Sequence, residues 1–192
     1  NLVLFLDMDD VCVLNAPYGA YDAVLALAAT ATSGHQAAAD AEDLWKQLVS
    51  PLAAALLRQL HHEFRPQYVL STTWWWLMDD ATLREGLDRS GLNFVVSNLH
   101  PDMATPKGNK PDVRWTEIKN WLLAHREYQN SWVVLDDLLS GTGLGTDLPS
   151  QLRPYVVLCQ ENVGLTSVEY EQLRTAFGLR MSQRMPRAGT GM

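Results

Sequence analysis

Cysteine is scarce in this 192-residue chain, which contains only Cys12 and Cys159. Two cysteines are too few for a disulfide framework, so a hydrophobic core has to hold the fold together. Both lie in apolar segments, where a small thiol is usually a buried packing residue. We therefore expect two free, buried thiols and a location in the reducing cytoplasm.

Positive charge is also in short supply, because 15 Lys and Arg face 22 Asp and Glu and the net charge is −7. Proteins that bind long nucleic acids without sequence preference neutralise many phosphates with a basic surface. The charge disfavours that class of protein. It is compatible with a local site for a small phosphorylated substrate, whereas a nucleic-acid end stays a candidate partner that the charge does not support.

Long hydrophobic runs are absent. No apolar stretch reaches the roughly 18 residues of a membrane span, and the first residues lack the basic region and apolar block of a secretion signal. We therefore expect no membrane partner. The length fits a single domain, which we place at residues 1–180, and residues 181–192 are expected to be a flexible tail.

Short, continuous apolar runs alternate with segments of helical periodicity. Such runs are typical of strands buried on both faces of a parallel sheet. The expected strands are residues 2–6, 68–70, 93–97, 132–135 and 155–158, the expected helices are residues 79–89, 113–125 and 167–177, and a polar loop is expected at 100–111. This alternation predicts an α/β fold, a Rossmann-like three-layer α/β/α sandwich around a mainly parallel central sheet.

An Ala- and Leu-rich segment separates the first two expected strands. Its leucines recur every four residues, at positions 44, 48, 52, 56 and 60, which is typical of a helix with one apolar face. We interpret residues 15–62, approximately, as a small helical, cap-like insertion after the first strand.

Reactive side chains follow three of the expected strands: Asp-Met-Asp-Asp at residues 7–10, Ser-Thr-Thr at 71–73 and Asp-Asp at 136–137. The carboxyl ends of parallel strands share one edge of a sheet, and ligands bind there. Carboxylates crowded at that edge repel one another unless a cation lies among them, and a hard divalent ion prefers oxygen ligands. Each Asp pair alone is as well explained as a cap of the next turn, but three strand ends in order favour a site.

Four segments resemble, in this order, the motifs of the haloacid dehalogenase (HAD) superfamily of phosphatases with an aspartate nucleophile. They are residues 4–11, 69–72, 110–114 and 133–137, and the resemblance spans residues 2–166. More narrowly, residues 70–74, 114–122 and 164–166 resemble a bacterial subgroup of small, nearly capless members, some of them linked to RNA repair. The resemblance implies a HAD-like fold and a magnesium-dependent phosphomonoester hydrolase with an aspartyl-phosphate intermediate.

The resemblance also implies roles for three residues of the first two motifs. Asp7 would be the nucleophile, and Asp9 would be the general acid for the leaving oxygen and would offer its backbone carbonyl to the metal. Thr72 would donate its hydroxyl to a phosphoryl oxygen. Ser71 or Thr73 would take that role if the alignment is shifted by one residue.

The basic residue of the third motif has more than one candidate. Lys110 precedes a proline as in many superfamily members, whereas Arg114 fits the spacing of the small subgroup, and we favour Arg114 slightly. Lys107 is a weaker third candidate. Each of them can instead be a solvated surface charge.

The expected cofactor is Mg²⁺, with Asp7, Asp9, Asp136 and Asp137 as its ligands. In members with an Asp-Asp pair the second acid binds the metal directly, which points to Asp137 and leaves Asp136 in a supporting role. The reverse assignment stays open.

Two further interpretations remain from the sequence. A catalytically weak or inactive HAD-like module for binding or regulation would keep the fold and metal without turnover. A phosphoacceptor receiver domain is disfavoured, because its acceptor follows a middle strand and not the first. The three tryptophans at residues 74–76 either pack against the sheet edge or form a stacking wall for a base or another aromatic substrate.

Overall fold

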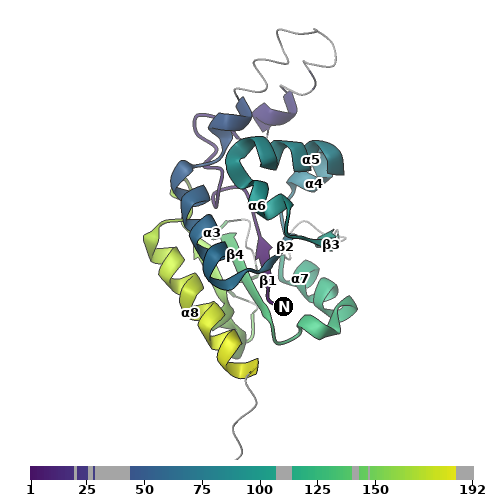
Figure 1. The fold of residues 1–192 in the computed structure, drawn as a ribbon, viewed down its shortest axis with the longest axis vertical. Helices are drawn as coiled ribbons and strands as arrows, with labels where there is room; N and C mark the ends of the chain where they lie inside the picture. Colours follow the sequence, from purple (N-terminus) through teal and green to yellow (C-terminus); the bar gives the residue numbers. More distant parts are fainter. Residues whose placement is uncertain are drawn as a thin grey trace, which may run out of the picture.

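A five-stranded parallel sheet forms the centre of the computed structural model, which describes residues 1–19, 21–25, 28, 44–106, 114–139, 143–146 and 148–184 (Figure 1). The strands are β1 (Val3–Leu6), β2 (Gln67–Leu70), β3 (Leu99–Ala104), β4 (Trp132–Asp137) and β5 (Val156–Cys159). Their order in the sheet is β3-β2-β1-β4-β5, and all neighbours are parallel. The predicted α/β fold with a parallel sheet is confirmed.

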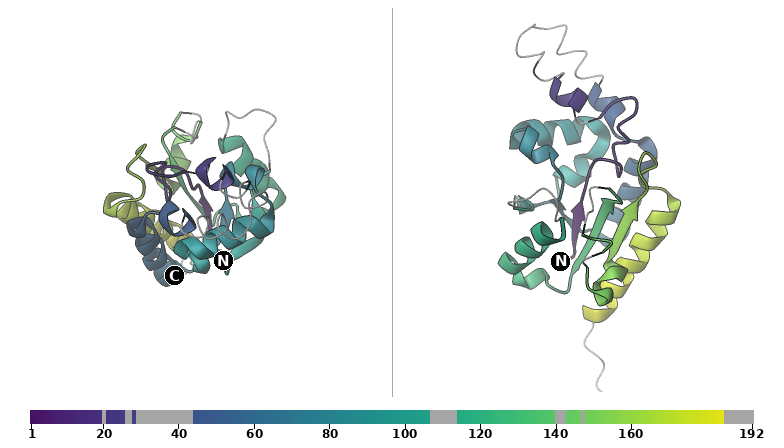
Figure 2. Two further views of the ribbon diagram at one scale, coloured as in Figure 1. Left: turned by 90° about the horizontal axis from the view of Figure 1, so that it is seen from above. Right: turned by 180° about the vertical axis from the view of Figure 1, so that it is seen from behind.

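Helices cover both faces of this sheet. On one face lie α3 (Pro51–Phe64) and α8 (Ser167–Arg184), and on the other lies α7 (Arg114–Ala124) (Figure 1 and Figure 2). The remaining helical elements are α4 (Trp74–Leu77), α5 (Asp80–Leu87), the π-helix η1 (Asp88–Leu92), α6 (Asn93–Val96) and the 3₁₀ helices η2 (Arg126–Tyr128) and η3 (Ser150–Tyr155). Residues 21–25 and 44–48 are also helical.

The central strand divides the hydrophobic core into two parts, because successive side chains of a strand point to opposite faces. Leu4 and Leu6 pack into a cluster shared with α3 and α8. Val3 and Phe5 pack into a second cluster with α7, in which Phe5 meets the ring of Trp121 edge-on at 5.3 Å. The continuous apolar run of β1 is therefore explained by burial on both faces.

Local signals in the sequence determine where α3 begins and ends. The hydroxyl of Ser50 accepts a hydrogen bond from the backbone N–H of Ala53, Pro51 is the first helical residue, and Arg65 ends the helix in the left-handed conformation. Residues 51–62 of this helix belong to the segment that we interpreted as the insertion. They pack against α8 in the sandwich, while residues 29–43 of that segment lie outside the described residues.

The expected strand at residues 93–97 is wrong: Asn93–Val96 form α6, and the third strand is β3, which begins one residue before the expected polar loop and takes up its first part. A short apolar run does not distinguish a strand from a buried helical turn, and here Leu92 and Val95 are buried from helical positions. β3 is an edge strand of polar sequence, and an edge strand tolerates Pro101 because one of its sides has no neighbouring strand to pair with.

The last helix is longer than expected, since α8 extends to Arg184 and not to Phe177, and so includes residues 181–184 of the expected tail. Residues 185–192 lie outside the described residues. Arg180 holds this part of the helix on the sheet, because it is buried and its Nε donates to the backbone oxygen of Trp132.

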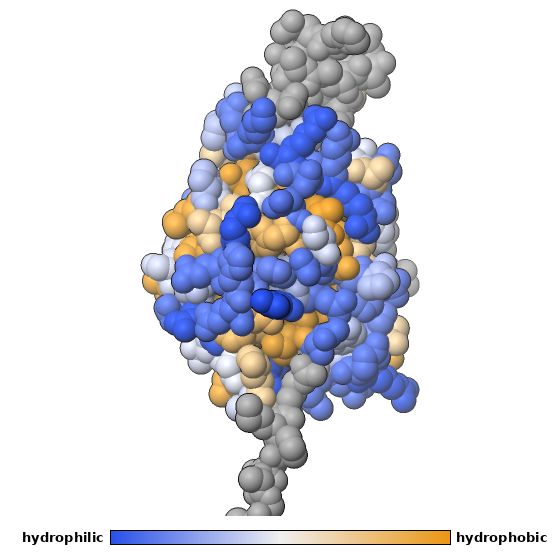
Figure 3. All heavy atoms as spheres, viewed as in Figure 1, coloured by the Kyte–Doolittle hydropathy of each residue, from blue (hydrophilic) through white to orange (hydrophobic). Residues whose placement is uncertain are grey.

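Two further expectations can be compared with the structure. Cys12 and Cys159 are both free and buried, as expected. No helix in the described part of the chain is long and apolar enough to cross a membrane. In the view of Figure 3, hydrophilic side chains cover much of the surface and apolar ones lie in smaller groups between them.

Candidate active site

The carboxyl ends of β1 and β4 bring three predicted metal ligands together. Asp7 follows β1, and Asp136 and Asp137 end β4. The two strands are neighbours in register, and the backbone N–H of Asp7 donates to the oxygen of Leu135 at 3.0 Å. All three carboxyl groups are buried and each offers one oxygen, with these oxygens within 4.8 Å of one another. The sheet order reverses between β1 and β4, which is where open α/β sheets bind ligands.

Arg114, the first residue of α7, reaches into this cluster and is itself buried. Its Nε lies 3.1 Å from Oδ2 of Asp136, and its Nη2 lies 3.6 Å from Oδ1 of Asp7. On its other side, Nη1 lies 3.4 Å from the buried carboxylate of Glu117, one helical turn further on. The structure thus places the favoured basic residue at the cluster, while Lys107 and Lys110 lie outside the described residues.

Burial and mutual repulsion disturb the ionisation of the cluster. Burial, and then the charge of Asp136, raise the pKa of Asp7 well above its ordinary value, although Arg114 opposes this. Burial also raises the pKa of Asp136 to about 7, against the opposing effect of Arg114. Burial by itself would lower the pKa of Arg114, but Asp136 and Asp7 raise it overall. One guanidinium therefore does not compensate the surrounding carboxylates.

A divalent cation fits these residues. Three buried carboxylates supply oxygen ligands of the kind that Mg²⁺ prefers. In addition, Oδ2 of Asp136 is buried and makes no hydrogen bond with the described residues, although the Nε of Arg114 is near, so one oxygen of the cluster still has acceptor capacity among them. The oxygens and their excess charge both favour a cation at this place.

Asp9 is held differently from the other three acids. Both oxygens of its carboxylate lie 3.0 Å from the indole Nε1 of Trp74, the first residue of α4. In the described part of the chain, its side chain is not one of the grouped metal-ligand carboxylates, so a metal role would fall to its backbone carbonyl. Burial raises the pKa of Asp9, and the hydrogen bond from Trp74 opposes the rise.

The sequence interpretation gave no role in the site to Glu117, and for Trp74 it offered only packing against the sheet edge or stacking on a substrate. Trp74 follows the second motif directly, and Glu117 belongs to the segment that resembles the small subgroup. These positions do not indicate which side chains the two residues contact. The contact between Trp74 and Asp9 joins residues 65 positions apart. Only the folded structure shows that Trp74 is fully buried and that its indole N–H donates to the carboxylate of Asp9.

Ser71 and Thr72 lie at the end of β2, next to β1, and both are buried. Oγ1 of Thr72 accepts a hydrogen bond from the backbone N–H of Trp74 at 3.4 Å. Among the described residues, the buried Oγ of Ser71 has no hydrogen-bond partner. Both hydroxyls therefore remain candidates for binding a phosphoryl oxygen, whereas Thr73 is exposed at the start of α4.

A parallel sheet that carries an acid cluster at the ends of β1 and β4, with a basic residue at the start of α7, the helix between β3 and β4, defines a HAD-type hydrolase. The comparison with protein families agrees: the chain belongs to the family described as the HAD domain in Swiss Army Knife RNA repair proteins, whose profile matches residues 3–170. No curated protein and no solved structure matches the chain.

Proposed function

We propose that this HAD-type hydrolase is a magnesium-dependent phosphomonoester hydrolase that works through an aspartyl-phosphate intermediate. The observation that carries the proposal is the buried group of Asp7, Asp136 and Asp137 with Arg114 against two of its members. A nucleophile for phosphoryl transfer has to approach an anionic group, so it needs positive charge and a fixed position. Arg114 supplies positive charge beside Asp7, and burial at the end of the central strand fixes the position of the Asp7 carboxylate.

The metal would be held by Asp7, by Asp136 or Asp137, and by the backbone carbonyl of Asp9. When bound, Mg²⁺ offsets the negative charge of the carboxylates and of the phosphoryl group. Arg114 adds a fixed positive charge at the same place, and Glu117 holds its guanidinium from the other side.

In the first half of the reaction, an oxygen of Asp7 attacks phosphorus and the bond from phosphorus to the leaving oxygen breaks. The carboxyl of Asp9 gives its proton to the leaving oxygen. In the second half, Asp9 takes a proton from water, the water oxygen attacks phosphorus, and the bond to Asp7 breaks to release phosphate. The hydroxyl of Ser71 or Thr72 donates to a phosphoryl oxygen in both halves.

The substrate is proposed to be a small phosphorylated molecule or the phosphorylated end of an RNA strand. The family description, which names RNA repair proteins, supports the second form. With a net charge of −7, the chain has no excess of positive charge that could neutralise many phosphates along a strand. Contact with RNA is therefore proposed for the terminal nucleotide only.

Hydrolysis of a generic aryl phosphate, measured with Mg²⁺ and with a chelator, tests this function. We expect release of phosphate that needs Mg²⁺ and is abolished in Asp7→Asn, because an amide of the same shape is a poor nucleophile and a weaker metal ligand. Asp10→Asn is the matched control. Asp10 is not in the acid group, and the retained oxygen still accepts the hydrogen bond from the backbone of Asn162.

Two results would contradict the proposal. If Asp7→Asn kept most of the activity, Asp7 would not be the nucleophile. If the wild-type protein hydrolysed neither aryl nor alkyl phosphates with Mg²⁺, the binding or regulatory module would be the better interpretation.

A further inference from the structure

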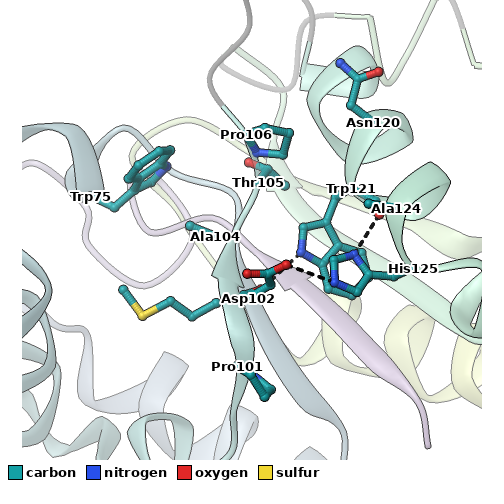
Figure 4. Close-up of a pocket in the computed structure, with 11 residues that line it drawn as sticks. Trp75, Pro101, Asp102, Ala104, Thr105, Pro106, Asn120, Trp121, Ala124 and His125 are labelled. Atoms are coloured by element: carbon teal, nitrogen blue, oxygen red, sulfur yellow. Dashed lines mark hydrogen bonds and ion pairs between the residues drawn. The ribbon is translucent and has the colours of Figure 1, made fainter.

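A cavity of about 440 Å³ lies beside the edge strand β3 (Figure 4), and Asp7, Asp136 and Asp137 are not among its lining residues. Its volume is within the usual range of small-molecule sites, roughly 300 to 1,000 Å³. Residues of three elements line it: Trp75 of α4, the segment from Pro101 to Pro106 in and after β3, and Asn120 and Trp121 of α7, with His125 just beyond that helix. None of these residues has a role in the proposed reaction.

Two links join this cavity to the proposed catalytic residues. Trp75 directly follows Trp74, whose indole N–H binds Asp9. On the other side, the backbone N–H of Thr105, which lines the cavity, donates to the oxygen of Leu70, the residue before Ser71. One end of the cavity therefore lies at the same edge of the sheet as the candidate phosphate site.

The walls of the cavity are mostly apolar. In the view of Figure 4, Trp75 lies on one side of Ala104 and Thr105, and Trp121 and His125 lie on the other. The ring of His125 stacks on Trp121, with the centroids 3.8 Å apart and the planes at 16°. Trp121 is buried and His125 covers its face, so Trp75, which is half-buried, is the tryptophan of this lining that keeps exposed ring surface. Exposed aromatic faces bind the faces of nucleobases and do so with little dependence on the base.

Polar groups at the rim suit the edge of a base and oppose a phosphate. Asn120 is exposed, and its amide can both donate and accept. The carboxylate of Asp102 is 73 % exposed and lies 3.1 Å from Nε2 of His125. None of the described residues that line the cavity is Lys or Arg, and the exposed carboxylate of Asp102 repels an anion, so this lining suits the uncharged part of a phosphate ester.

We propose that this cavity holds the nucleobase of a nucleotide whose phosphate is bound at Asp7. The proposal rests on the proposed phosphatase function and specifies its substrate class. The nucleotide is either a free mononucleotide or the last nucleotide of an RNA strand, since both present the same base, ribose and phosphate.

The test compares adenosine 5′-monophosphate with ribose 5-phosphate, which carries the same phosphate without a base. Stacking contributes roughly 1 to 3 kcal/mol per base, or about 5- to 150-fold. We expect wild-type kcat/KM to favour the nucleotide by at least about tenfold. Trp75→Ala should remove most of this preference by lowering kcat/KM for the nucleotide and leaving ribose 5-phosphate unchanged.

Two further variants separate stacking from general damage to the fold. Trp75→Phe keeps an aromatic face and should restore most of the preference. Leu77→Ala, on the same short helix, changes an exposed side chain that does not line the cavity and should leave the preference intact. Thermal melting of each variant confirms that it is folded.

The proposal is overturned if wild type hydrolyses both substrates equally, or if Trp75→Ala lowers both equally, and either result leaves the phosphatase function standing. If neither substrate is hydrolysed but an aryl phosphate is, the binding of adenosine is measured by calorimetry. The proposal is then overturned if adenosine does not bind, or if Trp75→Ala binds it as well as wild type does.

No hydrolysis of any phosphate ester contradicts the proposed function instead. A short 5′-phosphorylated oligoribonucleotide identifies the source: it is the better substrate if RNA ends occupy the cavity, and the mononucleotide is better otherwise.

Discussion

Two buried arginines lie at opposite ends of β4, and they have opposite surroundings. At the carboxyl end, Arg114 lies against the carboxylates of Asp7, Asp136 and Glu117. At the amino end, the guanidinium of Arg180 donates to the backbone oxygen of Trp132. Its central carbon lies 4.6 Å from the ring centre of Trp132 and 3.3 Å from that of Tyr155.

The difference shows that the carboxyl end of β4, and not its amino end, has the charge imbalance of a catalytic site. Carbonyl and aromatic groups stabilise Arg180 without an acid among these contacts, and burial lowers its pKa to about 10. That arrangement holds α8 on the sheet. Arg114 is surrounded by more acid than it compensates, and the pKa of Asp136 is raised by burial to about 7. An excess of buried negative charge costs stability, so a bound cation is expected there and not at Arg180.

Of the substitutions that test this comparison of the two arginines, replacing Arg114 should have the largest effect on activity. Arg114→Met keeps the bulk of the side chain and removes the charge, and we expect kcat/KM for an aryl phosphate to fall roughly 10²- to 10³-fold. Arg114→Lys should recover part of the loss, because it restores a positive charge but not the planar guanidinium that donates several hydrogen bonds. If Arg114→Met is folded by circular dichroism and retains activity close to wild type, Arg114 has no role in the reaction.

Arg180→Met should give the opposite pattern. Loss of a buried cation–π contact and of the hydrogen bond to Trp132 should lower the free energy of unfolding by about 1–3 kcal/mol, measured by urea denaturation. The kcat of the folded protein should stay unchanged. Reduced kcat with unchanged stability would remove the distinction between the two arginines.

The acid end of β4 could be predicted from the sequence, because its residues follow strands directly and strand order fixes where they meet. Asp7, Asp136 and Asp137 needed only the rule that parallel strands share a carboxyl edge. β3 and α6 could not be assigned correctly, since an edge strand has little apolar periodicity and a four-residue apolar helix resembles a strand. The contact of Trp74 with Asp9 depends on where α4 docks, which no local pattern specifies.

Removing that contact should have a smaller effect. Trp74→Phe keeps most of the buried ring and removes the N–H that holds Asp9, so we expect kcat for an alkyl phosphate to fall about tenfold. An aryl phosphate should be affected less, because its leaving group departs without a proton. Trp76→Phe, on the same helix, is the control. Equal losses on both substrates would show that Trp74 contributes by packing and does not position Asp9 for proton transfer.

The most direct test of the central claim, a cation site among Asp7, Asp136 and Asp137, is the effect of Mg²⁺ on thermal stability. A ligand that binds only the folded state stabilises it by about 2.7 kcal/mol at a hundredfold excess over Kd. The melting temperature should therefore rise in millimolar Mg²⁺ for wild type and Asp10→Asn. It should rise much less for Asp137→Asn, which retains the Oδ1 acceptor for the backbone N–H of Leu139. The same rise in Asp137→Asn would transfer the direct ligand role to Asp136, and no rise in any of the proteins would contradict the cation site itself.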